Sequence, residues 1–285
     1  MKKSVLILIL VLFQTAVCMA QDTAVVMKKV VYKKIGDKDL FADIFYTESG
    51  KQNKTAIALF HGGGWVFGDP AEFHEACRRF ARKGYVAVSF HYRLSRNTDG
   101  SYPHPEITPV ESTKDARSAI RWLRENAGRL KINPDKIVVG GQSAGGQMAL
   151  ATALLDSVNE ITDNLKVSPI PNALLLYSSN VNTLEPWIDM LLGDRRNEIW
   201  SISPYHNIKK PMPPVIAFRG DSDDQVLPYI AGMFKTKMNE LGNYYEEYVY
   251  LGKKHYLAPD NKKYATYFDE EILEKTDAFL KKFGF

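Results

Sequence analysis

The feature that most limits how this chain can fold is a regular alternation between short apolar segments and longer segments with helical periodicity. The short segments are 56–60, 85–90, 137–139, 173–177, 215–218 and 245–250, all of them apolar except at Ser89, Glu246 and Glu247. The segments with helical periodicity are 71–83, 111–130, 144–155, 227–241 and 265–283. Wholly apolar strands are buried on both faces, and strands that alternate with helices form parallel sheets. The pattern therefore predicts an α/β fold in which helices cover both faces of a mostly parallel sheet.

The N-terminal end of this sheet has a different pattern. Residues 25–32 and 40–46 contain the apolar and β-branched residues of strands, and Gly36-Asp37 between them is a turn signal. This predicts an antiparallel hairpin at the edge of the sheet. The 285 residues contain no internal repeat and no low-complexity linker, so a single domain over residues 21–285 is the simplest organisation.

The first twenty residues predict an export signal. Two lysines precede a run of nine apolar residues at 5–13, and Cys18-Met19-Ala20 places small residues where a signal peptidase reads the chain. Such a run is too short to span a bilayer as a helix. We therefore expect a signal peptide at 1–20, and a secreted or periplasmic mature protein without a stable membrane span. A lipoprotein anchor at Cys18 and a buried N-terminal helix are the alternatives.

Removal of the predicted signal peptide changes the net charge and the cysteine count of the mature protein. Removal of residues 1–20 lowers the formal net charge from +4 to +2 and leaves Cys77 as the one cysteine among about 265 residues. A single cysteine cannot form an internal disulfide, so the mature protein depends on its hydrophobic core for stability. The nearly balanced charge, without a basic stripe, argues against a nucleic-acid partner.

A Gly-x-Ser-x-Gly motif, Gly141-Gln142-Ser143-Ala144-Gly145, lies between a predicted strand and a predicted helix. In that position the motif forms a nucleophile elbow, a tight turn that lifts the serine hydroxyl above the sheet. The glycines are needed because neighbouring backbone segments come into contact there. The N-terminus of the following helix adds positive potential where an oxyanion would form.

A second motif, His61-Gly62-Gly63-Gly64-Trp65, follows the buried strand at 56–60 directly. Three successive glycines leave backbone N–H groups unshielded by side chains, as the donors of an oxyanion hole require. The carboxyl end of a parallel strand is also where open α/β sheets bind ligands. A flexible glycine loop would explain neither this position nor the flanking aromatic residues.

A serine nucleophile needs a general base, and the base needs an acid that orients it. Among six histidines, His255 follows the last predicted strand, where a loop can reach over the edge of the sheet. His61 belongs to the glycine motif, where we expect a structural role. The others are His74, His91, His104 and His206.

The acid candidates are concentrated in the segment 220–226, after the strand at 215–218. We rank Asp223 first, Asp224 second and Asp221 third. A solvated turn or a weak cation site would also fit three aspartates, but a calcium loop needs more oxygen ligands at regular spacing.

Taken together, these motifs resemble the α/β-hydrolase superfamily, and within it the hormone-sensitive-lipase-like and feruloyl-esterase-like carboxylesterases. The order Ser143, Asp223, His255 is that of α/β-hydrolases. Four further segments match the family between about residues 55 and 258: His91-Tyr92-Arg93-Leu94, the run from Asp115 to Leu123, Asn133 to Ile137 and Gly220 to Val226.

The resemblance implies a role for each matched residue. It makes Ser143 the nucleophile, His255 the general base and Asp223 the orienting acid, since the family acid comes three residues after the glycine that Gly220 matches. It also makes the backbone N–H groups of Gly63, Gly64 and Ala144 the oxyanion hole. For Arg93 and Asp115 we expect a structural ion pair rather than a catalytic role.

The segment 157–214 is irregular, and it is expected to form either a pocket wall or lid, or a surface helix or two without a role in binding. Too few residues precede His61 for the helical cap of lipase-like relatives, which predicts an open cleft. Trp65, Trp187 and Trp200 are candidate stacking surfaces for sugar, although core or rim positions would suit them equally.

The function that we expect is a secreted serine carboxylesterase that hydrolyses short acyl or feruloyl esters, carried on carbohydrate. The substrate is then a small-molecule or glycan ester, and no metal or organic cofactor is called for. The alternatives are a serine peptidase or amidase on the same fold, and a non-catalytic binding module. The sequence leaves the acyl group, the alcohol and the oligomeric state open.

Overall fold

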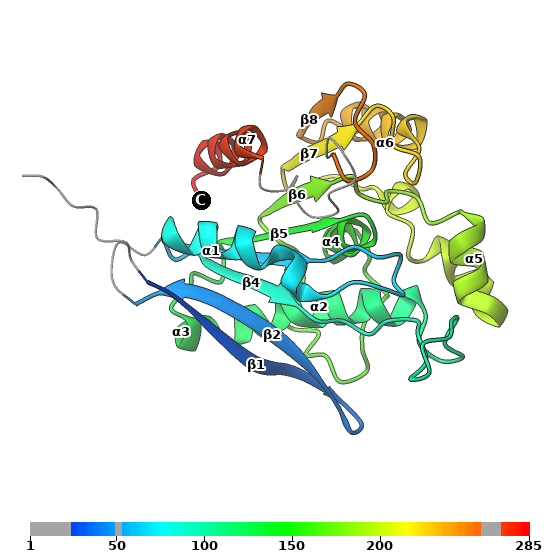
Figure 1. Cartoon of the computed structure of the whole chain (residues 1–285), viewed down its shortest axis with the longest axis horizontal. Helices are drawn as coiled ribbons and strands as arrows, with labels where there is room; N and C mark the ends of the chain where they lie inside the picture. The colour runs from blue at the N-terminus through cyan, green and yellow to red at the C-terminus, as the bar shows by residue number, and fades with distance from the viewer. Residues whose placement is uncertain (1–23, 49–52, 258–268) are drawn as a thin grey trace, which may run out of the picture.

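The computed structural model describes residues 24–48, 53–257 and 269–285 (Figure 1). One eight-stranded sheet runs through it in the order β1-β2-β4-β3-β5-β6-β7-β8. The strands are β1 Val25–Ile35, β2 Lys38–Thr47, β3 Ala56–Phe60, β4 Val86–Phe90, β5 Ile137–Gln142, β6 Ala173–Tyr177, β7 Val215–Gly220 and β8 Tyr245–Tyr250. Strands β3 to β8 pair in parallel, whereas β2 is antiparallel to both β1 and β4. The predicted sheet and hairpin are confirmed.

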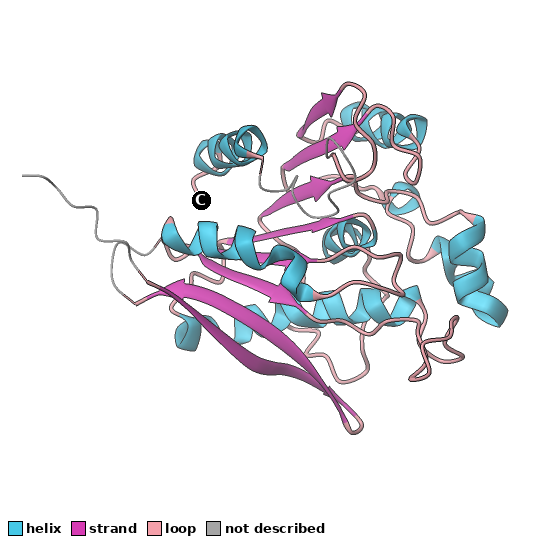
Figure 2. Cartoon of the chain, in the orientation of Figure 1, coloured by secondary structure: helices cyan, strands magenta, loops and turns pink. Residues whose placement is uncertain are grey.

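Helices cover both faces of this sheet, as predicted (Figure 2). The α-helices are α1 His74–Arg82, α2 Pro109–Glu125, α3 Ala127–Leu130, α4 Ala144–Leu154, α5 Pro186–Leu192, α6 Pro228–Glu240 and α7 Glu270–Lys282. Helices α1 and α7 share one hydrophobic cluster with Ile57 and Leu59 of β3. Helices α2, α4 and α6 share the other with Ala58 and Phe60. The alternation of side chains along β3 therefore divides the core into two layers.

Three helix boundaries differ from the predicted ones. The helix expected at 71–83 begins as a 3₁₀ turn, Pro70–Phe73, capped by Asp69. The helix expected at 111–130 starts at Pro109 and ends before Asn126, whose side chain donates a hydrogen bond to the carbonyl oxygen of Trp122 and competes with continued helix. Only four further residues, α3, are helical. The last helix begins at Glu270, and residues 258–268 lie outside the described residues, as does the predicted signal peptide at 1–20.

A buried network of charged groups joins the hairpin to helix α2 and to the segment that follows β4. Arg93 donates hydrogen bonds to both carboxylate oxygens of Asp115, each at 2.8 Å, and Lys33 of β1 adds a third at 2.7 Å. Glu160 accepts from Arg93 at 2.7 Å and from Lys33 at 3.2 Å. The expected ion pair between Arg93 and Asp115 is confirmed, and neither residue lines the large cavity described below.

In the part of the chain that the structure describes, no helix combines the length and the apolar character needed to cross a membrane.

Candidate active site

Ser143 occupies the sharp turn between β5 and α4. Its backbone has φ 53° and ψ −118°, a conformation that side-chain-bearing residues rarely adopt and that marks stored strain. The flanking glycines are required by contact: a Cβ on Gly145 would come within 2.0 Å of the Phe60 carbonyl oxygen, and one on Gly141 within 2.3 Å of the Gly145 backbone. The Ser143 backbone is held by the N–H of Asn180, which donates to its carbonyl oxygen at 3.0 Å. The motif thus has the predicted elbow geometry.

His255 lies in the loop after β8 and is almost completely buried. Its Nδ1 is 2.9 Å from Oδ2 and 3.0 Å from Oδ1 of Asp223, which is also buried. Asp223 Oδ1 accepts two further hydrogen bonds, from the backbone N–H groups of Gln225 and Val226, each at 2.9 Å. These bonds hold the carboxylate so that Nδ1 of His255 is its donor, which leaves Nε2 as the unprotonated nitrogen of the neutral ring.

The two other aspartates of the acidic segment have different partners. Asp221 accepts a hydrogen bond from the backbone N–H of Gly252 at 2.6 Å. Asp224 forms an exposed ion pair with Lys254 at 3.0 Å. Of the three candidates, Asp223 alone is hydrogen-bonded to His255.

The other histidines serve different parts of the fold. Nδ1 of His61 lies 2.8 Å from the carbonyl oxygen of Gly62, and the ring stacks on Tyr92. Burial, partly offset by the Gly62 hydrogen bond, lowers the pKa of His61 to about 4, so this ring is neutral near pH 7. His74 contacts Asp43, His91 packs on Phe41, His104 accepts backbone hydrogen bonds and His206 bonds to Ser203. Among all six histidines, only His255 lines the cavity that Ser143 faces.

Gln142, the residue before Ser143, contacts the base directly. Its amide Nε2 lies 3.0 Å from Nε2 of His255. Its Oε1 lies against the glycine loop, because a Cβ on Gly62 would come within 1.8 Å of that oxygen. One buried amide therefore links the elbow, the histidine and the glycine loop. Gln142 is not among the predicted site residues, although its position inside the Gly-x-Ser-x-Gly motif is a signal that points to it.

The glycine loop contributes Gly63 and Gly64 to the same cavity, with positive φ angles of 107° and 61°. The carbonyl oxygen of Gly63 accepts hydrogen bonds from the N–H groups of Val66 and Phe67, at 3.1 and 2.9 Å. Ala144 is the first residue of α4, so its N–H has no acceptor within the helix. Gly63 and Gly64 thus line the same cavity as Ser143, and Ala144 follows Ser143 directly in the chain.

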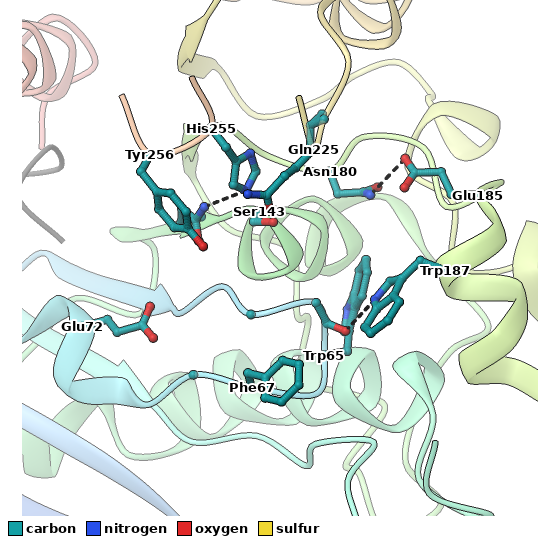
Figure 3. Close-up of a pocket in the computed structure, with 15 residues that line it drawn as sticks. Trp65, Phe67, Glu72, Ser143, Asn180, Glu185, Trp187, Gln225, His255 and Tyr256 are labelled. Carbon is teal, nitrogen blue, oxygen red and sulfur yellow. Dashed lines mark hydrogen bonds between the residues drawn. The ribbon is translucent and has the colours of Figure 1, made fainter. Parts of the chain in front are cut away.

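The cavity has a volume of about 460 Å³ (Figure 3). Aromatic side chains line it at Trp65, Phe67, Trp187 and Tyr256, and polar side chains at Glu72, Gln142, Ser143, Asn180, Glu185, Gln225 and His255. This mixture of aromatic and polar groups around a serine side chain is typical of a site for an organic substrate.

One wall of the cavity comes from the irregular segment 157–214, which had been expected to form either such a wall or a surface helix. Asn180 follows β6, and Glu185 and Trp187 begin α5. The Nδ2 of Asn180 donates to Oε1 of Glu185 at 3.3 Å. Burial raises the pKa of Glu185 to about 7, against the lowering effect of that hydrogen bond. No local motif marks Asn180 or Glu185 as a site residue.

The three tryptophans proposed as stacking surfaces occupy different environments. Trp65 is buried, and its indole N–H donates to Gln147 at 3.2 Å. Trp200 is 55% exposed and does not line the cavity. Trp187 is partly buried, lines the cavity and donates from Nε1 to the carbonyl oxygen of Gly64 at 3.1 Å. Of the two tryptophans that line the cavity, Trp187 is therefore the more exposed.

Two curated proteins are similar in sequence to parts of this chain. The arylesterase of Saccharolobus solfataricus is 33% identical over 140 residues, which are 48% of this chain and 42% of that protein. Lipase 2 of Moraxella sp. (strain TA144) is 34% identical over 108 residues, 38% of this chain and 23% of that protein. This chain thus spans less than half the length of these curated relatives.

A solved structure is similar over nearly the whole chain. Thermogutta terrifontis esterase 2, phosphoramylated by tabun, has a TM-score of 0.80 and 32% identity over 91% of this chain and 95% of that one. Its propionate-bound form has a TM-score of 0.80 and 31% identity, with the same coverage. The model of the BD-FAE family matches residues 42–238, well over half of the chain. The chain therefore belongs to the BD-FAE family and has the α/β-hydrolase fold of carboxylic ester hydrolases.

Proposed function

We propose that this protein is a serine carboxylesterase in which Ser143, His255 and Asp223 form the catalytic triad. The observation that carries this proposal is the geometry of one cavity. A serine on a strained strand-to-helix turn shares the cavity with a buried histidine, and Nδ1 of that histidine is bonded to Asp223. These are the roles that acyl transfer through a serine requires.

In the first half-reaction, Ser143 Oγ attacks the ester carbonyl carbon and its proton passes to Nε2 of His255. The amide of Gln142, which contacts Nε2 in this structure, gives way to the serine hydroxyl. Asp223 stabilises the imidazolium that forms. The N–H groups of Gly63, Gly64 and Ala144 donate hydrogen bonds to the oxyanion of the tetrahedral intermediate.

Collapse of that intermediate breaks the bond to the alcohol oxygen, which takes the proton from His255 and leaves. The acyl group remains bonded to Ser143 Oγ. A water molecule then gives its proton to His255 and attacks the acyl carbon, and the acid is released as Ser143 Oγ recovers its proton. No step draws on a group beyond these residues and water.

We further propose that the acyl group is short or feruloyl and that the alcohol is a carbohydrate. Thermogutta terrifontis esterase 2 has been solved with propionate and with butyrate bound, which supports a short acyl group. Export through the predicted signal peptide at 1–20 would bring the enzyme to extracellular glycan esters. N-terminal sequencing of the protein recovered from the periplasm or medium tests export, and a first residue of Gln21 is expected.

The proposed chemistry is tested by comparing the wild-type protein with Ser143→Ala on p-nitrophenyl acetate and on a dipeptide p-nitroanilide. We expect ester hydrolysis by the wild type, little or no anilide hydrolysis, and a loss of kcat of about 10⁴-fold or more in the variant. An unchanged rate in Ser143→Ala would disprove catalysis at this elbow. Faster turnover of the anilide than of the ester would identify a peptidase instead.

A further inference from the structure

The wall of the cavity built by Glu185, Asn180 and Trp187 carries polar groups that the proposed triad does not use. Asn180 is held by the nucleophile itself, because its backbone N–H donates to the Ser143 carbonyl oxygen at 3.0 Å. Its side-chain Oδ1 accepts from the N–H of Asn182 at 3.1 Å, which directs Nδ2 toward Glu185. Figure 3 shows this pair beside Ser143. The amide is thus fixed in orientation next to the reacting serine.

Glu185 is an unusual residue for this position because no cation balances it. Among the described residues, its side chain forms no ion pair, and its one hydrogen bond is the 3.3 Å contact with Asn180. It stands at the N-terminal end of α5, yet its carboxylate does not cap that helix. A partly buried carboxyl group without a strong partner costs stability, so a ligand that supplies hydrogen bonds would compensate it.

The chemical groups of this wall indicate which kind of ligand would supply hydrogen bonds to Glu185. A carboxyl oxygen accepts hydrogen bonds from hydroxyl groups, an amide N–H donates to them, and an indole ring packs against the carbon face of a sugar. The pKa of Glu185, raised to about 7 by burial, also means that a fraction of the carboxyl groups is neutral at pH 7. A neutral carboxyl can both donate to and accept from hydroxyls, whereas a cationic ligand would favour the charged form.

We propose that Glu185 and Asn180 form a subsite for the hydroxyl groups of a carbohydrate alcohol, with Trp187 along its carbon face. This inference rests on the proposed function, because it assigns the short acyl group to the rest of the cavity and the hydroxylated part of the ester to this wall. Glu185 acts by binding substrate and takes no part in proton transfer at Ser143.

The test compares acetylated xylobiose, which has hydroxyl groups beside its ester, with p-nitrophenyl acetate, which has none. The measured quantity is the ratio of the two kcat/KM values, which does not depend on the fraction of folded enzyme. In Glu185→Leu we expect this ratio to fall about tenfold, mainly through KM for the sugar ester, since lost hydrogen bonds in a site are worth about that factor. Glu185→Gln, which keeps hydrogen-bonding groups, should lower it less than threefold.

Asp189→Asn is the matched control, because it removes a carboxylate from the same helix but outside the cavity. Its ratio should equal that of the wild type. Equal losses on both substrates in Glu185→Leu would overturn the subsite. A loss in Glu185→Leu that is selective for acetylcholine, a cationic ester, would also overturn it. The same holds for a wild-type enzyme that cleaves p-nitrophenyl acetate but not acetylated xylobiose. Failure on every ester would instead refute the proposed function itself.

Discussion

The indole Nε1 of Trp187 donates a hydrogen bond to the carbonyl oxygen of Gly64 at 3.1 Å. This bond joins α5, which comes from the long connection after β6, to the glycine loop after β3. A Cβ on Gly64 would lie only 3.0 Å from the same indole nitrogen, so the two segments are in close contact. The position of Gly64, and with it the direction of its N–H, therefore depends on a residue more than a hundred positions away.

We expect Trp187→Phe to lower kcat on p-nitrophenyl acetate about fivefold, because loss of one hydrogen bond of roughly 1 kcal/mol loosens the donor loop. Steady-state kinetics measure the change. Trp200→Phe is the control, since Trp200 is 55% exposed and lies outside the cavity. Equal rates in Trp187→Phe and the wild type would show that the glycine loop holds its position without this bond.

Asp223→Asn should reduce kcat by about 10³- to 10⁴-fold, the effect known for the corresponding change in the serine protease triad. The backbone N–H groups of Gln225 and Val226 hold Oδ1, so the asparagine Nδ2 faces Nδ1 of His255. This favours the ring tautomer that is protonated at Nε2, which cannot accept the serine proton. Asp224→Asn provides the control, because Asp224 is exposed and bonds to Lys254 instead of His255. A larger loss of kcat in Asp224→Asn than in Asp223→Asn would show that Asp223 is not the orienting acid.

Two glycine substitutions are expected to have opposite effects on stability. A Cβ on Gly145 would collide with the backbone carbonyl oxygens of Phe60 and His61, at 2.0 and 2.5 Å, whereas nothing lies within 4 Å of one on Gly128 in α3. Gly145→Ala should destabilise the fold by about 3 kcal/mol. Gly128→Ala should stabilise it by roughly 0.5 to 1 kcal/mol, through helix propensity. Urea unfolding of both variants measures these changes, and a stable Gly145→Ala would contradict the contacts at the elbow.

The network around Asp115 predicts a dependence of stability on pH. Burial alone would raise the pKa of Glu160, but Lys33 and Arg93 outweigh it and hold that pKa at about 2. Because the folded value lies below the ordinary one, the stability contributed by Glu160 is present above about pH 4.5 and is lost as the pH falls toward 2.

Glu160→Gln should therefore destabilise the protein at pH 7 by roughly 1.5 to 3 kcal/mol, the worth of hydrogen bonds to a charged group. The difference from the wild type should shrink between pH 5 and pH 2.5, as urea unfolding at each pH would show. Glu75→Gln, an exposed site, should change little at any pH. A difference that stays constant with pH would mean that the charge of Glu160 does not stabilise the fold.

Most of the fold could be predicted because its signals are local. A strand such as β3 is wholly apolar over five residues, and the turn at Gly36-Asp37 connects the two strands of the hairpin as expected. Boundaries were less predictable where a side chain competes with the backbone. Asn126 ends α2 with φ −101° and ψ 13°, and its side chain bonds to Trp122, whereas the helical periodicity continues past that point.

The candidate site divides in the same way. The elbow at Ser143 and the glycine loop are short motifs that residue type and spacing locate, so the sequence by itself predicted them, whereas the exact position of Gly64 also depends on Trp187. The order of Asp223, Asp224 and Asp221 as acid candidates could be predicted from the sequence and the family resemblance. Only the tertiary structure showed which carboxylate meets a histidine some thirty residues later.

The structure alone also placed Asn180, Glu185 and Trp187 in the same cavity as Ser143, because the connection after β6 has no periodicity that fixes its path. Packing against the glycine loop determines that path, through contacts such as the one between Trp187 and Gly64. Residue type and spacing along a chain encode turns, strands and helices, whereas contacts between distant segments arise only when those elements pack together.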